Sequence, residues 1–403
     1  MKRRAFFRDS AAGGLGLWAA APLASGQETP GVSPAAAAAE MPLVLSPPVV
    51  MAPRPDGVEI IWAVSALATG RVEFGGTAEL GQAAHSTPWG FTPQGTKVLR
   101  VRLEGLKPGT AYHFRSVTER AGKTPETHQS ELRSFRTLDP AAASTSFTVW
   151  NDTHRHEETI RKLLEVTPAA DFNLWNGDTC NDWMTPDLFI PTLLAPAGGA
   201  EITARSPLLV TRGNHDVRGP YAFEFSDYIA MPSGRPFYSF RSGPVAFLCL
   251  DTGEDKDDDH PSFQGRAAFE PLRREQAAWI EQEIKRPEIG QAPYRVVFCH
   301  LPLRWLDETP TTDYDRFSLR SRKLWHDALV RWGAQVIISG HTHHAAMILG
   351  NNEFPYAQIT GGGPQLAGAT LITGEADATS LRLKTLRLGD GSEKNTLVLM
   401  PLG

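Results

Sequence analysis

In the stretch Leu208-Leu-Val-Thr-Arg-Gly-Asn-His-Asp216, an apolar run changes abruptly into a group of polar side chains. Four further blocks follow apolar runs in the same way: Asp152-Thr-His154, Gly177-Asp178, His300 and Gly340-His341-Thr-His343. Continuous apolar runs are typical of strands covered on both faces. The carboxyl ends of such strands in an α/β sheet open into the ligand-binding crevice. The blocks therefore predict an α/β domain whose polar residues meet at one edge.

The spacing of apolar residues predicts the elements of this domain. Strands are expected at 146–150, 171–175, 206–211, 244–250, 294–299 and 335–339. Five of them end in a polar block, and the strand 244–250 ends at Asp251, which we interpret as structural. Helical periodicity predicts two amphipathic helices, with an apolar stripe facing inward and charges facing outward. They span 271–286 and 321–332.

The residue types of the blocks suit metal binding. Carboxylates, an amide oxygen and imidazoles form the ligand set for two metal ions side by side. The i, i+2 spacing within the first and last blocks suits a turn that aims two side chains at one point. Glycine allows the backbone to turn sharply where a ligand emerges, and it stands at 177, 213 and 340. With Asp152 and Asp178 as the anionic ligands, two divalent cations leave a net positive site that attracts phosphate oxygens and activates water.

The chain from about 43 to 138 has a different pattern. Short alternating runs separated by turn signals predict strands at 58–62, 70–74, 98–102 and 111–115. Such spacing predicts an all-β sandwich of about a hundred residues. The segment Leu106-Lys-Pro-Gly-Thr-Ala-Tyr112 resembles the loop-to-strand signature of fibronectin type III domains and the N-terminal domain of purple acid phosphatases. No cluster of catalytic residue types occurs in it.

The first 26 of the 403 residues form a separate segment. Lys2-Arg3-Arg4, a weakly apolar stretch and the small residues Ala24-Ser25-Gly26 resemble a twin-arginine signal peptide. This resemblance implies a periplasmic or secreted protein. Residues 27–42 and 139–144 are interpreted as linkers because of their alanine and proline content.

The bulk composition excludes several classes of protein. A net charge of -5 gives no electrostatic footprint for nucleic acid. No apolar run approaches the roughly 20 residues that span a bilayer, so we expect no transmembrane segment in the mature chain. Three cysteines without framework spacing argue against a disulfide-stapled fold. Cys180, Cys249 and Cys299 are interpreted as small buried hydrophobic residues.

The ordered blocks resemble the signature of calcineurin-like metallophosphoesterases over about residues 145–350, and we expect this core to continue to residue 403. The resemblance implies an α/β domain of two central sheets flanked by helices. Together with the N-terminal sandwich, the layout is similar to that of the bacterial relatives of purple acid phosphatases.

The resemblance also implies a role for each block residue. It implies a first metal held by Asp152, His154 and His343 and a second held by Asn214, His300 and His341, with Asp178 bridging both. His215 is then a catalytic residue beside the phosphate, stabilising the transition state or protonating the leaving group, and Asp216 orients it. In this mechanism a metal-bridging hydroxide attacks phosphorus in line.

One position departs from the purple acid phosphatase pattern. These enzymes carry a tyrosine three residues after the bridging aspartate, where this chain has Asn181. His154 is present in the first block instead, which is closer to the phosphodiesterase-type branch. The metal pair therefore stays open among iron, manganese and zinc.

The resulting hypothesis is an exported dinuclear-metal hydrolase of small-molecule phosphomonoesters or phosphodiesters. A nucleotide or phospholipid phosphodiesterase of the same superfamily is the main alternative. A surface-binding protein that works through the sandwich ranks lower, because no member of the metal blocks is missing.

Several charged residues near the blocks have two interpretations. Arg155, Arg218 and Arg304 lie close enough in sequence to reach a phosphate, but we favour surface ion pairs for them. The acidic run 254–259 is interpreted as a solvated loop near the rim of the cleft rather than as a cation site.

Overall fold

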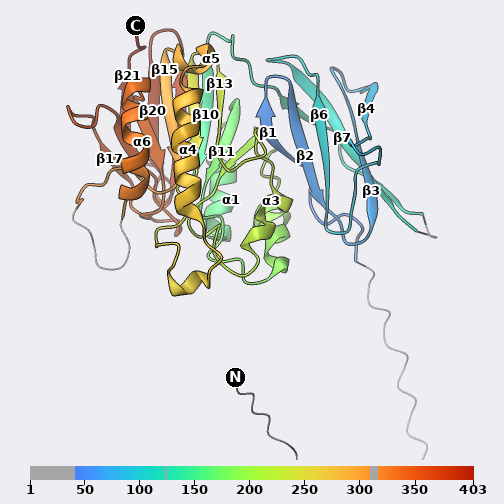
Figure 1. Ribbon diagram of the computed structural model, residues 1–403. Helices are drawn as coiled ribbons and strands as arrows, with labels where there is room; N and C mark the ends of the chain where they lie inside the picture. The colour runs from blue at the N-terminus through green and yellow to red at the C-terminus, as the bar shows by residue number, and fades with distance from the viewer. Residues whose placement is uncertain (1–40, 123–124, 309–315) are drawn as a thin grey trace, which may run out of the picture. The chain divides into compact units, whose positions relative to one another are not determined.

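The computed structural model describes residues 41–122, 125–308 and 316–403 (Figure 1). The predicted signal peptide and nearly all of the predicted linker 27–42 lie outside the described residues. None of the helices in the described part of the chain combines the length and hydropathy needed to cross a bilayer.

The first of two central sheets contains the strands that lead into three polar blocks. β10 (Thr145–Trp150), β11 (Phe172–Asn176) and β12 (Leu208–Thr211) run parallel to one another, as the apolar runs predict. Three antiparallel strands from the end of the chain extend this sheet beyond β10: β19 (Thr370–Ala376), β20 (Leu381–Arg387) and β21 (Glu393–Leu399).

The second central sheet carries the other two blocks. β14 (Val245–Leu250), β15 (Tyr294–Cys299) and β16 (Val336–Ser339) are parallel. The sheet is completed by β13 (Tyr238–Ser242), β17 (Ala346–Ile348) and β18 (Ala357–Thr360). The polar blocks thus come from the carboxyl ends of strands in two sheets, three from one and two from the other.

Aromatic side chains fill the space between the two sheets. Phe147 and Phe172 of the first sheet stack at a centroid distance of 5.5 Å, and Phe247 and Phe298 of the second stack at the same distance. The two pairs meet edge to face, with Phe147 5.3 Å from Phe247. This arrangement is a favourable geometry for aromatic rings, so it fixes the spacing of the sheets whose ends carry the blocks.

Helices cover the outer face of each sheet (Figure 1). The first sheet is covered by α1 (Glu157–Val166), a π-helical turn η2 (Ile190–Leu194) and α3 (Phe225–Tyr228). The second is covered by α4 (Phe269–Glu283), α5 (Pro287–Gly290) and α6 (Leu319–Trp332). The remaining short helices are α2 (Pro196–Gly199), η1 (Pro186–Leu188), η3 (Ala222–Glu224) and η4 (Pro261–Phe263).

Helix α4 differs from its prediction in which side chains it buries. Ile280 is buried as expected, but Arg273 and Gln276 are buried beside it, at 1% and 0% exposure. Their side chains hydrogen-bond the backbone of the loop after β14, at Asp251, Thr252 and Glu254. Charge on this helix is therefore not confined to the outer face, because a loop without regular structure needs partners for its buried backbone groups.

The N-terminal strands form two sheets around a core of their own. One sheet contains β1 (Val49–Arg54), β2 (Gly57–Ala63) and β6 (Val98–Glu104). The other contains β3 (Ala68–Gly75), β4 (Gln82–Ala84), β5 (Gln94–Gly95), β7 (Ala111–Arg120), β8 (Thr127–Gln129) and β9 (Arg133–Arg136). This region is all-β as predicted. Its first sheet also pairs with the central sheet, because β1 lies parallel to β12 with Met51 opposite Leu208.

Candidate metal centre

Side chains from all five polar blocks meet at the carboxyl ends of the two central sheets. The residues that can hold a cation form two groups: Asp152, His154, Asp178 and His343 in one, and Asp178, His300 and His341 in the other. The ligand atoms within each group lie within 4.8 Å of one another. Asp178 belongs to both groups, which is the position expected for a residue that bridges two metals.

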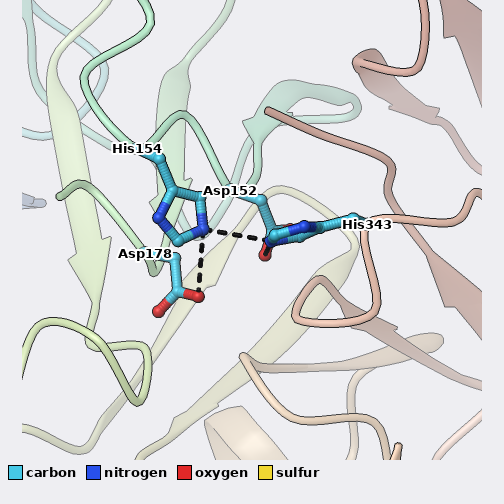
Figure 2. A group of neighbouring side chains, drawn as sticks. All are labelled: Asp152, His154, Asp178 and His343. Atoms are coloured by element: carbon cyan, nitrogen blue, oxygen red, sulfur yellow. Dashed lines mark hydrogen bonds and ion pairs between the residues drawn. The ribbon is translucent and has the colours of Figure 1, made fainter. Parts of the chain in front are cut away.

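The first group is arranged around the imidazole of His154 (Figure 2). Its Nε2 lies 3.1 Å from Nε2 of His343 and 3.4 Å from Oδ2 of Asp178. Oδ1 of Asp152 lies 3.6 Å from Nε2 of His343. Two imidazole nitrogens and two carboxylates thus point at one small volume.

The second group shares Asp178 with the first. Nε2 of His300 is 3.2 Å from Oδ2 of Asp178, the same oxygen that faces His154. Oδ1 of Asn214 lies 2.9 Å from Nδ1 of His341, so the amide oxygen from the third block joins this group. All seven predicted ligands therefore lie in the two groups or in direct contact with them.

The backbone at the site is strained. Positive φ angles occur at five of the seven predicted ligands: Asp152, His154, Asp178, His341 and His343. Residues other than glycine rarely adopt a positive φ angle. Groups of such residues occur at functional sites. The backbone is therefore held in a costly conformation that aims these side chains inward.

The block glycines act differently from the prediction. Gly177 has φ +82° and allows a sharp turn, as expected. Gly213 and Gly340 do not have positive φ angles. Glycine is required at these two positions because there is no room for a Cβ atom. A Cβ at 213 would lie 2.2 Å from Oδ1 of Asp178, and one at 340 would lie 2.3 Å from Oδ2 of Asp152.

Hydrogen bonds to oxygen acceptors orient two of the imidazoles. Nδ1 of His300 donates to the carbonyl of Asn176 at 2.8 Å, and Nδ1 of His154 donates to Oδ1 of Asn181 at 2.9 Å. An acceptor at Nδ1 places the proton there and leaves Nε2 with a lone pair for a cation. Asn181, which stands where purple acid phosphatases have a tyrosine, thus orients a predicted ligand histidine.

Asn176 also joins the two sheets at the site, a role that the sequence did not reveal. Its amide nitrogen donates to Oδ1 of Asn151 and lies 3.4 and 3.3 Å from the carbonyls of Cys299 and Ile338. Its Oδ1 accepts from Thr211 at 2.5 Å. The asparagine immediately before each of the first two blocks, at 151 and 176, was the available signal.

The donor atoms fit bound cations. Within the described residues, Oδ2 of Asp152 and Nε2 of His300 are buried without a hydrogen-bond partner. Buried polar atoms are usually satisfied, and a cation held by the two groups would satisfy both of these. Carboxylate, amide and imidazole donors suit intermediate divalent metals.

The charges at the site are strongly coupled. Burial raises the pKa of Asp152 to about 7. Burial opposes the charged form of His300, but Asp178 and Asp152 outweigh it and raise the pKa of His300 to about 10. Burial also opposes ionisation of Asp178, yet His300 and His154 hold its pKa well below the ordinary value. Without metal, this protein would hold protons where the cations are expected.

His215 lies at the edge of this cluster but Asp216 does not orient it. The ring of His215 is 5.0 Å from that of His154, centroid to centroid, and its Nδ1 is 2.5 Å from the carbonyl oxygen of Asn181. Asp216 is buried and accepts from the amides of Asp178 and Gly213, both at 2.8 Å. Asp216 therefore does not orient His215 as expected. Its hydrogen bonds connect the second block to the third instead.

The charged residues near the site also differ from the prediction. Arg218 is not a surface ion pair, because it binds the buried Glu254 and Asp255 and contacts His215. The start of the acidic run is therefore buried and paired rather than solvated. Arg304 is 6% exposed and donates to the carbonyls of Leu349 and Tyr356.

Comparison with known proteins agrees with this geometry. Residues 145–345 match the model of the calcineurin-like phosphoesterase family. This part of the chain is a calcineurin-like metallophosphoesterase domain, and the match covers the polar blocks from Asp152 to His343.

Two curated relatives resemble the chain over part of its length. A serine/threonine-protein phosphatase CPPED1 of Mus musculus is 29% identical over 141 residues, which are 35% of this chain and 42% of the relative. Purple acid phosphatase 15 of Arabidopsis thaliana is 23% identical over 280 residues, which are 60% of this chain and 48% of the relative. The chain spans less than half the length of these two relatives.

Two solved structures share the fold. Purple acid phosphatase PPD1 from yellow lupin seeds aligns with a TM-score of 0.65 at 13% identity, over 88% of this chain and 74% of that chain. The structure of PhoD aligns with a TM-score of 0.57 at 11% identity, over 88% of both chains. These alignments cover more than residues 145–345, so the likeness in fold extends outside the matched domain.

Proposed function

We propose that the chain is a dinuclear-metal hydrolase of phosphate esters. The observation that carries the proposal is the single carboxylate oxygen of Asp178 that faces both groups of ligands, at 3.2 Å from His300 and 3.4 Å from His154. In this proposal Asp152, His154 and His343 hold one cation, Asn214, His300 and His341 hold the other, and Asp178 is shared.

In the proposed reaction, the metal ligands hold the cations that bind phosphate, and His215 supplies a proton to the leaving oxygen. Two divalent cations would outweigh the two ligand carboxylates, attract phosphate oxygens and lower the pKa of a bound water. The carbonyl of Asn181 can only accept a hydrogen bond, so Nδ1 of His215 donates to it. Nε2 is then the nitrogen that His215 has available to hold a proton for the leaving oxygen.

The substrate class is tested by direct hydrolysis. Metal-free protein is loaded separately with iron, manganese or zinc and offered p-nitrophenyl phosphate and bis(p-nitrophenyl) phosphate. The proposal expects metal-dependent release of p-nitrophenol that a chelator abolishes. The ratio of the two rates separates a phosphomonoesterase from a phosphodiesterase. No turnover of either ester with any metal would contradict the proposed activity.

We also propose export through the twin-arginine route, on the basis of Lys2-Arg3-Arg4 and the small residues at 24–26. Replacing Arg3 and Arg4 by lysine should keep the charge but abolish export. Cell fractionation and immunoblotting measure this directly. An unchanged periplasmic fraction in the double variant would exclude the route.

A further inference from the structure

Arg218 stands between His215 and a buried pair of acids. Its side chain is 19% exposed, and the side chains of Glu254 and Asp255 are 0% and 3% exposed. Nε and Nη2 of Arg218 bind the carboxylate of Glu254, and Nη2 lies 2.8 Å from Oδ1 of Asp255. The two acids thus hold the guanidinium through Nε and Nη2, and the remaining nitrogen, Nη1, contacts His215.

The contact with His215 leaves the in-plane lone pair of Nε2 available. Nη1 of Arg218 lies 3.1 Å from Nε2 and 3.4 Å from Nδ1 of the ring. A nitrogen bonded to Nε2 along its in-plane lone pair would lie much farther from Nδ1. The near-equal distances therefore place Nη1 over the ring, away from the direction of that lone pair.

Four contacts surround the His215 ring, one of them a carboxylate: Oδ1 of Asp182 lies 3.4 Å from Nδ1. Nδ1 donates to the carbonyl of Asn181, His154 packs edge to face at 78°, and Arg218 lies over the ring. The carbonyl contact fixes the rotation of the ring, and the two packing contacts limit its tilt. Rotamer freedom that is removed before the substrate arrives need not be lost in the transition state.

The support for Arg218 is continuous with the interior of the domain. Glu254 lies in the loop after β14, and its backbone carbonyl accepts from Arg273 of α4 at 2.6 Å. Arg273 also donates to the carbonyl of Thr252 at 3.0 Å. The buried Arg273 thus fixes the backbone of the loop that carries Glu254, and the carboxylate of Glu254 in turn binds Arg218.

We infer that Arg218, fixed by Glu254, is a positioning residue for His215. The inference rests on the proposed function, since it assumes that His215 delivers a proton to the leaving oxygen. Lysine cannot reproduce the two-nitrogen contact of Arg218 with Glu254, so Arg218→Lys should retain only part of the wild-type activity.

The test compares leaving groups that need protonation with one that does not. Arg218→Met and Glu254→Gln should lower kcat for an alkyl phosphate by about 10–100-fold, as loss of a supporting contact typically does. They should lower kcat for p-nitrophenyl phosphate only a few-fold, with KM nearly unchanged for both. Arg235→Met is the matched control, because Arg235 forms an exposed ion pair with Glu275.

A double-mutant cycle with His215→Ala makes the test specific. If Arg218 acts through His215, then Arg218→Met adds little to the loss already caused by His215→Ala. Additive losses, or a raised KM with unchanged kcat, would overturn the inference and make Arg218 a phosphate contact or a general structural residue. A wild-type chain that hydrolyses no phosphate ester would instead refute the proposed function.

A measurement independent of turnover complements the cycle. In protein labelled with 15N-histidine, the Nδ1 proton of His215 should give a slowly exchanging signal that disappears in His215→Ala. Arg218→Met should speed its exchange with solvent, and Arg218→Lys should do so less. An unchanged exchange rate in folded Arg218→Met would contradict the inference.

Discussion

At the scale of single residues, the site depends on oxygen acceptors that bind Nδ1 of a histidine, so that Nε2 keeps its lone pair. Asn181 illustrates the point, since its side-chain oxygen orients His154 and its backbone oxygen orients His215. The position was visible in the sequence as a departure from the purple acid phosphatase pattern. Its two contacts were not, because they depend on how the loop after β11 folds back over the site.

Replacing Asn181 should affect metal affinity before it affects chemistry. Asn181→Ala removes the acceptor for Nδ1 of His154 but keeps the backbone carbonyl that binds His215. We expect affinity at the first metal site to fall by about 10–100-fold, while kcat at saturating metal changes only a few-fold. Equilibrium dialysis measures the affinity, and Asn181→Asp, which keeps an acceptor, is the control. Unchanged affinity in Asn181→Ala would show that the contact is dispensable.

The raised pKa values predict competition between protons and metal. His300, with a pKa of about 10, is protonated at neutral pH in the metal-free protein, and Asp152, with a pKa of about 7, is partly protonated. Both must lose their protons to bind a cation. Metal affinity should therefore fall as the pH is lowered, by about tenfold per pH unit for each proton displaced.

Calorimetric titration in buffers of different ionisation enthalpy counts the protons released. The exposed His128 provides a control, since His128→Ala should release the same number as the wild type. Metal binding that is independent of pH between 6 and 8 would contradict the assignment of His300 and Asp152 as ligands.

At the scale of elements, the ordered apolar runs predicted the strands well, because burial on both faces leaves a direct signal in the sequence. The helix α4 was harder, since its buried face includes Arg273 and Gln276. Hydrophobic periodicity cannot identify a polar residue that is buried to satisfy a loop 20 residues away in the chain. For the same reason, the burial of Glu254 and Asp255 at the start of the acidic run could not be predicted.

The polar face of α4 should be important for stability. Arg273→Leu leaves the buried carbonyls of Thr252 and Glu254 without this donor, which should cost about 2–4 kcal/mol. Arg274→Leu, on the exposed face of the same helix, should change stability by less than about 0.5 kcal/mol. Urea unfolding of metal-loaded protein measures both. Equal effects of the two changes would show that the buried arginine contributes nothing specific.

At the scale of the whole molecule, the all-β region and the phosphoesterase domain share a sheet. The strand β1 pairs with β12, and Val49, Met51 and Ile61 pack in one core with Leu208 and Val210. The sequence predicted both regions and the linker 139–144 between them. It did not predict the shared sheet, because pairing between strands about 150 residues apart leaves no local pattern.

Removing the all-β region should therefore destabilise the phosphoesterase domain. Each large apolar side chain that loses burial costs about 1.5–3 kcal/mol, and a domain is typically stable by only 5–15 kcal/mol. A chain without residues 43–138 should express as insoluble or unfolded protein, as judged by circular dichroism and thermal unfolding. A chain that begins at residue 41 is the control. A soluble, active deletion variant with unchanged Tm would show that the shared core is unnecessary.

The proposed function depends on a two-metal centre shared through Asp178, and this dependence is tested by counting bound metal and measuring turnover in one titration. Metal-free protein is titrated with manganese while bound metal and p-nitrophenyl ester hydrolysis are followed together, in the wild type, in Asp178→Asn and in the exposed control Asp259→Asn. We expect two ions per chain, turnover that requires both, and at least about a thousandfold loss in Asp178→Asn from several kcal/mol of lost charge stabilisation. Full turnover with one ion or none, or wild-type activity in Asp178→Asn, would contradict this dependence.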